Sequence, residues 1–402
     1  MRILIVSPVL PYPQTSGFTI RVFQFLTLLG RRHEVSLLAY GQPGEADKVT
    51  ALQKLCAQVD VVPPRTASTS GKRFAQLAST LSWRSYQTTT HYSPQMQDRL
   101  DQLSRRHAFD VIQLETSPLA GFRFSPDSTV ALVEHDIIFE LLYRMYKAER
   151  SPVRRLYNRL EYAKFRRDEI ASWRRVDGCI ATSSREVPII RRHAPGVPIM
   201  VAPNGVDGSY FAPSDGRVDE NTIVMTGFMK TRPNIDGALY FVNAILPLVL
   251  QSKPAAKFYI VGGSPPEEIR RLASPQVVVT GEVPDVRPYV HKAAVVVVPL
   301  RMGGGTRLKI LEGLSMEKAM VSTTIGAEGI DVKHREHLLI ADEPAAFADA
   351  VVHLLSNPAA GGTLARAGRE LVDRTYQWSA VVDRVETFYS ELVQSHRQRM
   401  AP

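Results

Sequence analysis

The fold of this chain is best read from one stretch, Pro299-Leu-Arg-Met-Gly-Gly-Gly-Thr-Arg-Leu-Lys-Ile-Leu-Glu312. It follows a short apolar segment, 293–298, and it leads into a helical pattern with Leu308, Leu311 and Leu314 on one side. A strand, a glycine loop and a helix start in this order point unpaired backbone N–H groups at an anion. The stretch therefore predicts an anion-binding loop that follows a buried strand.

Charged residues in the same stretch indicate which anion would bind. Arg307 and Lys309 add positive charge within the first helical turn, and Glu312 lies one turn beyond Lys309 on roughly the same side. A carboxylate at that position can accept hydrogen bonds from vicinal sugar hydroxyls. The pattern suits a nucleoside diphosphate whose ribose lies beside its phosphates. The alternative is a glycine linker into a surface helix, which the three glycines taken alone fit equally well.

Short apolar segments alternate with helix-like segments along almost the whole length. Continuous hydrophobicity, as in Val295-Val-Val-Val298, indicates burial on both faces and so a parallel sheet under helices. The predicted strands are 2–6, 33–39, 59–62, 110–114, 129–134 and 176–181 in the first half, and 222–226, 257–261, 276–280, 293–298, 318–323 and 338–341 in the second. Two such series predict an α/β protein with two doubly wound, Rossmann-like domains.

The break between the two series falls in a patch rich in Pro, Gly and Asp. It contains Pro203-Asn-Gly-Val-Asp207 and Ala212-Pro-Ser-Asp-Gly216, which have turn chemistry. We therefore expect domains at 1–205 and 206–376, with a C-terminal helix at 377–395 that crosses back to the first domain. Ligands of open α/β sheets bind beyond the carboxyl ends of the strands. Two domains facing each other there would enclose a cleft.

Size and composition are those of a soluble globular protein with room for two domains. The chain has 402 residues, of which 44% are hydrophobic and 22% are charged. The apolar start stops at Ser7-Pro8, which favours a first buried strand over a signal peptide. No apolar stretch is expected to span a bilayer. Cys56 and Cys179 lie far apart without metal-type spacing, so we expect no disulfide and a reducing cytoplasm.

The net charge of +9 is concentrated in one stretch. Residues 144–192 hold 14 Lys/Arg and 6 Asp/Glu, a balance of +8. A solvated basic face accounts for this charge, as does attraction to anionic lipid headgroups or to a phosphate-bearing substrate. Nucleic acid is less favoured, because no nucleic-acid motif accompanies the charge. Apolar residues at helical spacing predict an amphipathic helix here: Val153, Leu156, Leu160, Ala163 and Ile170.

The first half offers its own candidate residues. Gly17 stands at a predicted helix start near Phe18, where a phosphate could approach the backbone, although a structural cap explains it equally well. His135 directly follows the strand at 129–134, which places it at the expected cleft rim. Glu115 and Asp136 lie at comparable strand ends and could act as acids or bases.

Several motifs are absent from the sequence. It has no Walker A loop and no G-x-G-x-x-G fingerprint, which lowers the odds of an NTPase or a dinucleotide oxidoreductase. It also has no H-E-x-x-H, no nucleophile elbow and no Asp-x-Asp pair that could carry a divalent ion. Cationic side chains and helix-terminal amides would then have to stabilise a departing diphosphate without a metal.

Taken together, these residues resemble the GT-B glycosyltransferases, and within them the retaining glycosyltransferase family 4. The resemblance covers essentially the whole chain and rests on the order and spacing of its motifs. These are Ser16-Gly17, His135, Pro203–207, Gly227-Phe-Met-Lys-Thr-Arg-Pro-Asn-Ile-Asp-Gly237, Gly262-Gly263, Gly281-Glu-Val-Pro-Asp285, Gly303–312 and Thr324-Ile-Gly-Ala-Glu-Gly329.

The resemblance implies a role for each matching residue. Glu312 would bind the ribose hydroxyls of the donor. Catalytic contacts would come from His135 near the reacting carbon and from Arg307 and Lys309 at the diphosphate. The remaining donor-binding residues implied by the resemblance are Gly17, Gly227, Arg232, Val283, Gly304, Gly305 and Thr306, with Val283 beside the nucleobase.

The chain departs from the family pattern at two places. The family motif has another Glu eight residues before the position of Glu312, where it contacts the donor sugar, but this chain has Gly304. The basic residues usual near the first helix of the second domain have no clean match. Lys230 and Arg232 lie in that loop, but Asn234-Ile-Asp-Gly occupies the lysine region. Backbone groups would therefore replace the Glu, and Arg307 and Lys309 would carry most of the phosphate charge.

The function implied is transfer of a sugar, with retention, from a nucleoside diphosphate sugar to a hydroxyl acceptor in polysaccharide, glycolipid or cell-envelope glycan synthesis. No metal or other cofactor is expected. The partners would be the donor, an acceptor that can be lipid-linked and, through the basic stretch, an anionic membrane surface, but not nucleic acid. We expect a cytoplasmic protein, peripheral on the inner face of the plasma membrane. Two alternatives stay open: a GT-B-like nucleotide-sugar epimerase, and a non-catalytic nucleotide-sugar-binding protein.

Overall fold

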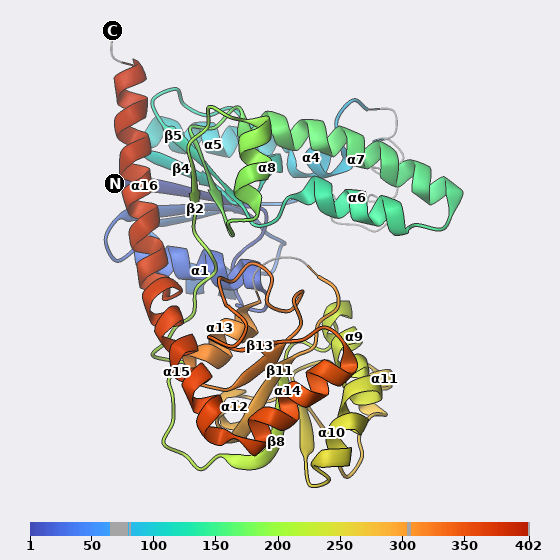
Figure 1. The fold of residues 1–402 in the computed structure, drawn as a ribbon. Coiled ribbons are helices and arrows are strands. Elements are labelled where there is room, and N and C mark those ends of the chain that lie inside the picture. The colour runs from blue at the N-terminus through green and yellow to red at the C-terminus, as the bar shows by residue number, and fades with distance from the viewer. Residues whose placement is uncertain (65–78, 80–81, 304–306, 401–402) are drawn as a thin grey trace. The chain divides into compact units, whose positions relative to one another are not determined.

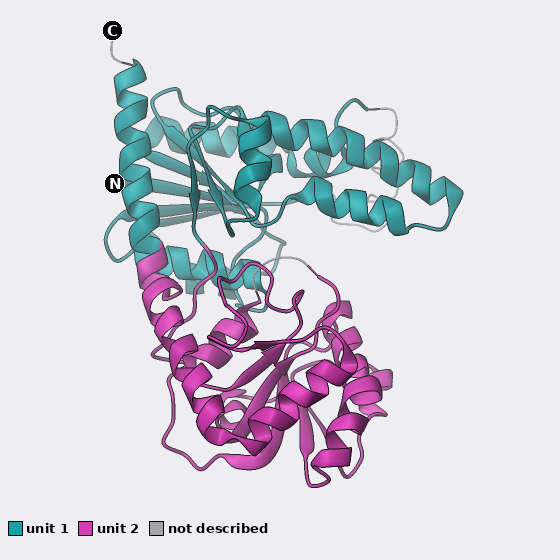
Figure 2. Ribbon diagram, viewed as in Figure 1, with its two compact units in different colours: residues 1–202, 382–402 teal, residues 203–381 magenta. Residues whose placement is uncertain are grey.

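The computed structural model describes residues 1–64, 79, 82–303 and 307–400 and divides into two compact units (Figure 1). Unit 1 comprises Met1–Ala202 and Val382–Pro402, and unit 2 comprises Pro203–Val381 (Figure 2). The division at 202/203 lies three residues before the boundary expected from the sequence. Each unit has its own parallel sheet and its own hydrophobic core.

Unit 1 is built on a seven-stranded parallel sheet in the order β3-β2-β1-β4-β5-β6-β7. Its strands are β1 (Arg2–Ser7), β2 (Glu34–Tyr40), β3 (Gln58–Val62), β4 (Val111–Leu114), β5 (Thr129–Glu134), β6 (Gly178–Ala181) and β7 (Ile199–Val201). Strands β4, β5 and β6 are buried along their whole length, as continuous hydrophobicity predicts. The strand order reverses between β1 and β4, and this reversal is a topological switch point.

Two groups of helices cover this sheet. Ile112 and Leu114 of β4 face a core that includes residues of α5 and α7, whereas Gln113, which alternates with them, faces α16. The helical elements of unit 1 are α1 (Gly17–Leu29), α2 (Ala46–Gln53), α4 (Tyr86–His91), α5 (Pro94–Arg106), η1 (Ser117–Gly121), α6 (Ile138–Ala148), α7 (Pro152–Trp173) and α8 (Glu186–His193). Helix α16 (Trp378–Met400) begins in unit 2 and belongs to unit 1 from Val382 onward.

Unit 2 contains a six-stranded parallel sheet in the order β10-β9-β8-β11-β12-β13. Its strands are β8 (Asp219–Thr226), β9 (Lys257–Val261), β10 (Val277–Gly281), β11 (Ala293–Val298), β12 (Met320–Ser322) and β13 (Leu339–Ile340). The order reverses between β8 and β11, so the loops that follow these two strands flank the switch point.

The helices of unit 2 lie between its strands in the sequence or follow its last strand, β13. They are α9 (Arg232–Tyr240), the π-helical turn η2 (Phe241–Ile245), α10 (Leu246–Ser252), α11 (Glu267–Arg270), α12 (Arg287–Lys292), α13 (Leu308–Ser315), α14 (Pro344–Ser356) and α15 (Pro358–Thr375). Contrary to the sequence expectation, the continuous run Arg232–Ser252 is long and apolar enough to cross a membrane. Phe241, Ile245 and Val249 of this run pack into the core of unit 2, which accounts for its apolar character.

Every strand predicted from the sequence is present, within a few residues of its predicted ends. β7 was not predicted. It has only three residues, all half-buried, so it carries little hydrophobic pattern. The predicted amphipathic helix is α7, which pairs with α6, and the two helices project from the sheet of unit 1 (Figure 1). Of its predicted apolar stripe, Ile170 packs partly against the core, but Val153, Leu156, Leu160 and Ala163 are exposed. The helix also buries Phe165 and Trp173, which were not predicted.

Candidate functional site

The residues singled out by the sequence lie at the carboxyl edge of the sheet in each unit. In unit 2, Gly227 directly follows β8, and the loop after β11 leads into α13. In unit 1, Glu115 directly follows β4, and His135 directly follows β5. Open α/β sheets bind their ligands at such strand ends, beside the switch point. Each unit therefore carries one group of candidate residues in the place where its topology favours a ligand.

Two glycines bring the backbones of neighbouring loops together in unit 2. Gly227 has φ of +152°, and Gly262, which follows β9, has φ of +149°. A Cβ atom on Gly262 would lie 1.9 Å from the carbonyl oxygen of Gly227. One on Gly227 would lie 2.7 Å from both the Lys309 Nζ and the Asn234 Nδ2. Both positions need glycine, because a side chain would displace either the backbone or the lysine.

Lys309 of α13 reaches across the switch point to the end of β8. Its ammonium donates hydrogen bonds to the carbonyl oxygen of Thr226, at 2.6 Å, and to Oδ1 of Asn234, at 2.8 Å. The Asn234 amide in turn donates to the carbonyl oxygen of Phe228, at 3.0 Å. Burial lowers the pKa of Lys309 to about 8, an effect that Glu312 opposes and Arg307 reinforces. These bonds hold a cation in place beside the glycine turn.

Arg307 lies immediately before α13 and close to the glycine loop. Gly303 has φ of +126°, and a Cβ atom there would lie 2.7 Å from Nη2 of Arg307. The guanidinium therefore occupies the space that the missing side chain leaves open. Three predicted donor-binding residues, Gly304, Gly305 and Thr306, lie outside the residues that the structure describes.

Glu312 lies three residues after Lys309 on α13, as the sequence predicts. Burial raises the pKa of its carboxyl to about 7, and the attraction of Lys309 opposes this rise. Glu312 and Lys309 thus perturb each other electrostatically, which places their charged groups in one region. A carboxyl with this pKa is partly ionised near neutral pH and can accept hydrogen bonds from hydroxyl groups.

Arg232 follows β8 and Val283 follows β10, two strands that flank β9 in the sheet, but no hydrogen bond or ion pair joins either of them to Lys309 in the described residues. Arg232 is the first residue of α9 and is exposed. Val283 follows β10 and packs partly against the core of unit 2. In unit 2 the structure therefore gathers Gly227, Lys309 and Glu312 with Arg307.

In unit 1, Gly17 begins α1 within a complete helix cap. The Ser16 hydroxyl accepts a hydrogen bond from the Thr19 backbone N–H, at 3.2 Å, and the Thr19 hydroxyl accepts one from the Ser16 backbone N–H, at 3.0 Å. The ring of Phe18, the next residue, lies 4.7 Å from the ring of His135, centroid to centroid. The helix start and the histidine therefore lie together in unit 1.

His135 is held by three contacts. Its Nε2 lies 2.9 Å from Oε2 of Glu115, its backbone carbonyl accepts a hydrogen bond from the Thr182 hydroxyl at 2.9 Å, and Phe18 packs on its ring. Glu115 is almost fully buried, whereas the His135 side chain is 20% exposed. Glu115, which the sequence left without a partner, is thus paired with His135. Asp136 is exposed and lies one residue further on.

The structure connects two further residues, Asn234 and Arg21, to these groups. Asn234 was treated only as a departure from the family pattern, yet it accepts a hydrogen bond from Lys309. Arg21 was not singled out. It is fully buried on α1 and interacts electrostatically with Glu115. Its spacing of four residues from Gly17 would have placed it on the same side of the predicted helix.

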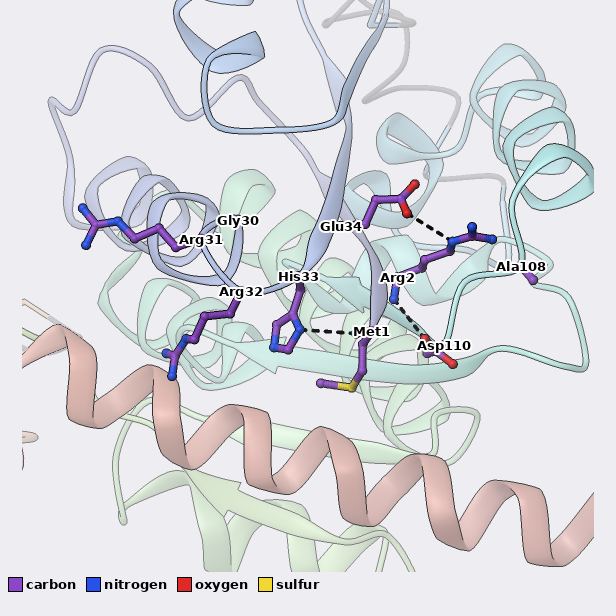
Figure 3. A pocket seen from close by; sticks show the side chains of 9 residues that line it. All are labelled: Met1, Arg2, Gly30, Arg31, Arg32, His33, Glu34, Ala108 and Asp110. Carbon is purple, nitrogen blue, oxygen red and sulfur yellow. Dashed lines mark hydrogen bonds and ion pairs between the residues drawn. The ribbon is translucent and has the colours of Figure 1, made fainter.

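No metal site is formed by the described residues, since no group of three or more His, Cys, Asp and Glu side chains among them could hold an ion. A hollow of about 750 Å³ lies at the opposite, amino-terminal edge of the unit 1 sheet. Figure 3 shows the side chains that line it. Its polar groups bond to one another: Arg2 pairs with Glu34 at 3.2 Å, and the Met1 ammonium lies 3.3 Å from Nδ1 of His33. This hollow lies away from the switch point and contains none of the candidate residues.

Comparisons with known proteins agree with this arrangement. The model of Glycosyltransferase Family 4 matches residues 15–210, and that of Glycosyl transferases group 1 matches residues 220–357. An uncharacterized 44.6 kDa protein in the cps region of Klebsiella pneumoniae is 24% identical over 144 residues, or 34% of this chain. That alignment spans 37% of the relative's own length.

Solved structures match over nearly the whole chain. Sucrose-phosphate synthase from Thermosynechococcus elongatus has a TM-score of 0.70 at 18% identity, covering 98% of this chain and 100% of that one. HepE from Anabaena, in complex with UDP, has a TM-score of 0.68 at 13% identity, covering 97% and 100%. WaaG, a glycosyltransferase involved in lipopolysaccharide biosynthesis, has a TM-score of 0.62 at 12% identity, covering 96% and 99%. At these identities the structural matches establish the fold alone. The two family models and the shared two-sheet architecture together identify the chain as a GT-B glycosyltransferase that resembles family 4.

Proposed function

We propose that this protein transfers a sugar from a nucleoside diphosphate sugar to a hydroxyl acceptor, with retention of the anomeric configuration. The observation that carries the proposal is the arrangement at the switch point of unit 2. There the Lys309 ammonium is fixed beside Gly227, with Arg307 and Glu312 in the same region. A cation beside a side-chain-free turn suits a diphosphate, and a carboxylate one helical turn away suits ribose hydroxyls.

The proposed reaction needs no cofactor and no metal ion. The bond between the anomeric carbon and the phosphate oxygen breaks, and the acceptor oxygen bonds to that carbon from the same face. The acceptor proton passes to the departing phosphate oxygen. In this scheme Lys309 and Arg307 stabilise the charge that develops on the diphosphate, and His135 contacts the donor sugar near the reacting carbon.

The comparisons support the choice of donor and the setting. HepE was solved with UDP-glucose as well as with UDP. The Klebsiella relative is encoded in a cps region, and WaaG takes part in lipopolysaccharide synthesis. We therefore propose a role in the synthesis of cell-envelope glycans, with a lipid-linked hydroxyl compound as one class of acceptor.

Product analysis tests this proposal. The protein is incubated with UDP-, GDP- and ADP-sugars, with and without lipid-linked and free glycan acceptors, and the products are analysed by mass spectrometry and NMR. A new glycoside with the donor's anomeric configuration supports the proposal. An isomerised donor would instead identify an epimerase. A donor that binds and stays unchanged with every acceptor would identify a non-catalytic binding protein.

As part of the same proposal, we place the protein in the cytoplasm, on the inner face of the plasma membrane. The paired helices α6 and α7 expose six large apolar side chains: Leu141, Tyr143, Met145, Val153, Leu156 and Leu160. Val153 is 80% exposed and Leu156 is 59% exposed. Exposed cations accompany them along the same two helices and the turn between them: Arg144, Lys147, Arg150, Arg154, Arg155 and Arg159. Apolar side chains among cations fit the interface of an anionic bilayer.

Co-sedimentation with vesicles tests this location. Each cation near an anionic surface contributes about 1 kcal/mol, and the apolar side chains add to it when they leave water. We expect the protein to bind vesicles of phosphatidylcholine with phosphatidylglycerol, and to bind pure phosphatidylcholine much less. The double variant Val153→Ser/Leu156→Ser should lose most of this binding. Val218→Ser, which changes an exposed valine of unit 2, should not. Equal binding to both kinds of vesicle contradicts the proposed location.

A further inference from the structure

A hydrogen-bond network of polar side chains extends from His135 to helix α16. Gln113 of β4 donates a hydrogen bond from Nε2 to Oε1 of Glu115, and the Tyr389 hydroxyl donates one to Oε1 of Gln113. Glu115, Gln113 and Tyr389 are each at most 1% exposed. Tyr389 lies 276 residues from Gln113 in the sequence. The network therefore joins the strand that precedes Glu115 to the C-terminal helix.

The direction of each hydrogen bond in this network follows from which groups can donate and which can only accept. A carboxylate only accepts hydrogen bonds, so Gln113 and His135 each present an N–H group to the Glu115 carboxylate. The Gln113 amide can do this only if its oxygen points the other way, toward Tyr389. Burial raises the pKa of Tyr389 well above its ordinary value, and the charge of Glu115 adds to this rise. The phenol therefore stays protonated and remains a donor.

Arg21 supplies the counter-charge for the buried carboxylate. It is 1% exposed, and its guanidinium lies 4.8 Å from the centre of the Phe25 ring. Burial lowers the pKa of Arg21 to about 10, an effect that Glu115 and Tyr389 oppose, so Arg21 is still protonated at neutral pH. A buried carboxylate with a nearby cation and two N–H donors is a rigid acceptor, because any rearrangement leaves a buried polar group unsatisfied.

We propose that Glu115 is a positioning residue that holds His135 as the Nε2–H tautomer, and that Gln113 and Tyr389 connect this control to helix α16. Nδ1 is then the ring nitrogen that faces a ligand as a hydrogen-bond acceptor. The consequence for turnover rests on the proposed function, in which His135 contacts the donor sugar. The choice of tautomer does not depend on the proposed function. The network thus links the histidine to a helix whose first turn, Trp378–Val381, belongs to unit 2.

The test is an NMR measurement on the full-length protein with ¹⁵N-labelled histidine. Long-range ¹H–¹⁵N spectra, recorded at alkaline pH where imidazole is neutral, report which ring nitrogen carries the proton. His135→Gln identifies the signal by its loss. We expect the Nε2–H tautomer in the wild type and a mixture of tautomers in Glu115→Gln and in Tyr389→Phe. Ser390→Ala removes an exposed hydroxyl from the same helix and should leave the wild-type tautomer.

Kinetics supply the second measurement, with whichever UDP-, GDP- or ADP-sugar the wild type consumes. In both positioning variants we expect kcat to fall about tenfold with little change in KM for the donor, since partners that orient a reacting group typically contribute this much. An unchanged tautomer in Glu115→Gln overturns the positioning role. An unchanged tautomer in Tyr389→Phe overturns the connection to α16. A wild-type protein that consumes no donor contradicts the proposed function, while the NMR comparison still decides this inference.

Discussion

Lys309 carries positive charge in a place that water reaches poorly. Burial lowers its pKa to about 8, and its bonds to Thr226 and Asn234 fix where the ammonium lies. An anionic ligand binds the protonated form more tightly than the neutral form. Because the pKa of Lys309 is about 8, the affinity for an anionic ligand depends on pH near neutrality. Lysines with an ordinary pKa are fully protonated in this range.

We therefore expect nucleoside diphosphate affinity to fall as the pH rises from about 7 to about 9, because the lysine loses its proton across its pKa of about 8. Lys309→Arg should abolish most of this dependence, since a guanidinium stays protonated throughout. Isothermal titration calorimetry at several pH values measures the effect. Identical pH profiles for the wild type and Lys309→Arg would show that Lys309 does not hold the phosphates.

Glu312 gives a second pH-dependent prediction at the residue scale, this time for stability. Its pKa is about 7 in the folded protein, against an ordinary value of 4.5. Between these values the folded state binds more protons than the unfolded state, so this group makes stability fall as the pH rises through that window. Glu312→Gln removes the titration. Its Tm should exceed that of the wild type above pH 7, and the difference should disappear toward pH 4.5.

Thermal unfolding by circular dichroism at pH 5 and pH 8 provides the comparison. Glu317→Gln is the matched control, because Glu317 is a half-buried carboxylate two residues beyond the end of α13. A gain in Tm for Glu312→Gln that is the same at both pH values would contradict the assignment of the raised pKa to burial of the carboxyl.

At the scale of elements, the β8 and β9 turns depend on two glycines that touch. Gly262→Ala places a Cβ atom 1.9 Å from the Gly227 carbonyl oxygen and forces alanine to φ of +149°. We expect a loss of about 1–3 kcal/mol in the free energy of unfolding. Gly362→Ala, within α15 and without a close contact, should instead stabilise the protein by up to about 1 kcal/mol. Urea unfolding measures the free energy of unfolding of both variants. Equal changes in the two would contradict the close contact between Gly262 and Gly227.

Helices and strands were predicted best where one hydrophobicity pattern continues along the whole element. The buried strands were found because their hydrophobicity is continuous, and α13 was found because a glycine loop precedes it. β7 was missed because three half-buried residues carry no clear pattern. The helix α7 was predicted from Val153, Leu156 and Leu160, but periodicity cannot say whether a stripe meets the core or the solvent. In the structure these residues are exposed, and the core contacts come from Phe165 and Trp173.

The candidate site was predicted in part for the same reason. Lys309 and Glu312 lie close in sequence, so helical spacing alone places them together. The partners of Lys309, Thr226 and Asn234, lie 83 and 75 residues away, and only the fold brings them to the ammonium. Glu115 and His135 were each noted at a strand end, but their pairing depends on the order of β4 and β5 in the sheet.

At the scale of the whole molecule, α16 belongs to unit 1 from Val382 onward. Its buried residues Val385, Tyr389 and Leu392 complete the packing of that unit. Leu392 lies where a Cβ atom on Gly178 would be, which shows how closely the helix approaches the sheet. Arg32 adds an ion pair with Asp383, at 2.7 Å. Unit 2 has a core that includes none of these residues.

Removal of residues 382–402 should therefore loosen unit 1 and leave unit 2 folded. Hydrogen exchange followed by mass spectrometry measures each unit within the same sample. We expect faster exchange in β1, β4 and β6, and unchanged exchange in β8, β9 and β11. An increase in exchange of the same size in both sheets would contradict the conclusion that the two units have independent cores.

The central claim is that Lys309 holds the phosphates of a nucleotide sugar, and a second buried lysine allows a direct test. Lys318 also lies in unit 2, its pKa is also lowered to about 8 by burial, and it also donates to backbone carbonyls, those of His291 and Ala293. It precedes β12, at the amino-terminal edge of the sheet. The measurement is the affinity of UDP, GDP and ADP for the wild type, Lys309→Met and Lys318→Met. The account predicts a loss of about 10- to 100-fold in Lys309→Met, the value of a hydrogen bond to a charged group, and little change in Lys318→Met. Equal affinities in Lys309→Met and the wild type, for the nucleotide that binds best, would contradict it.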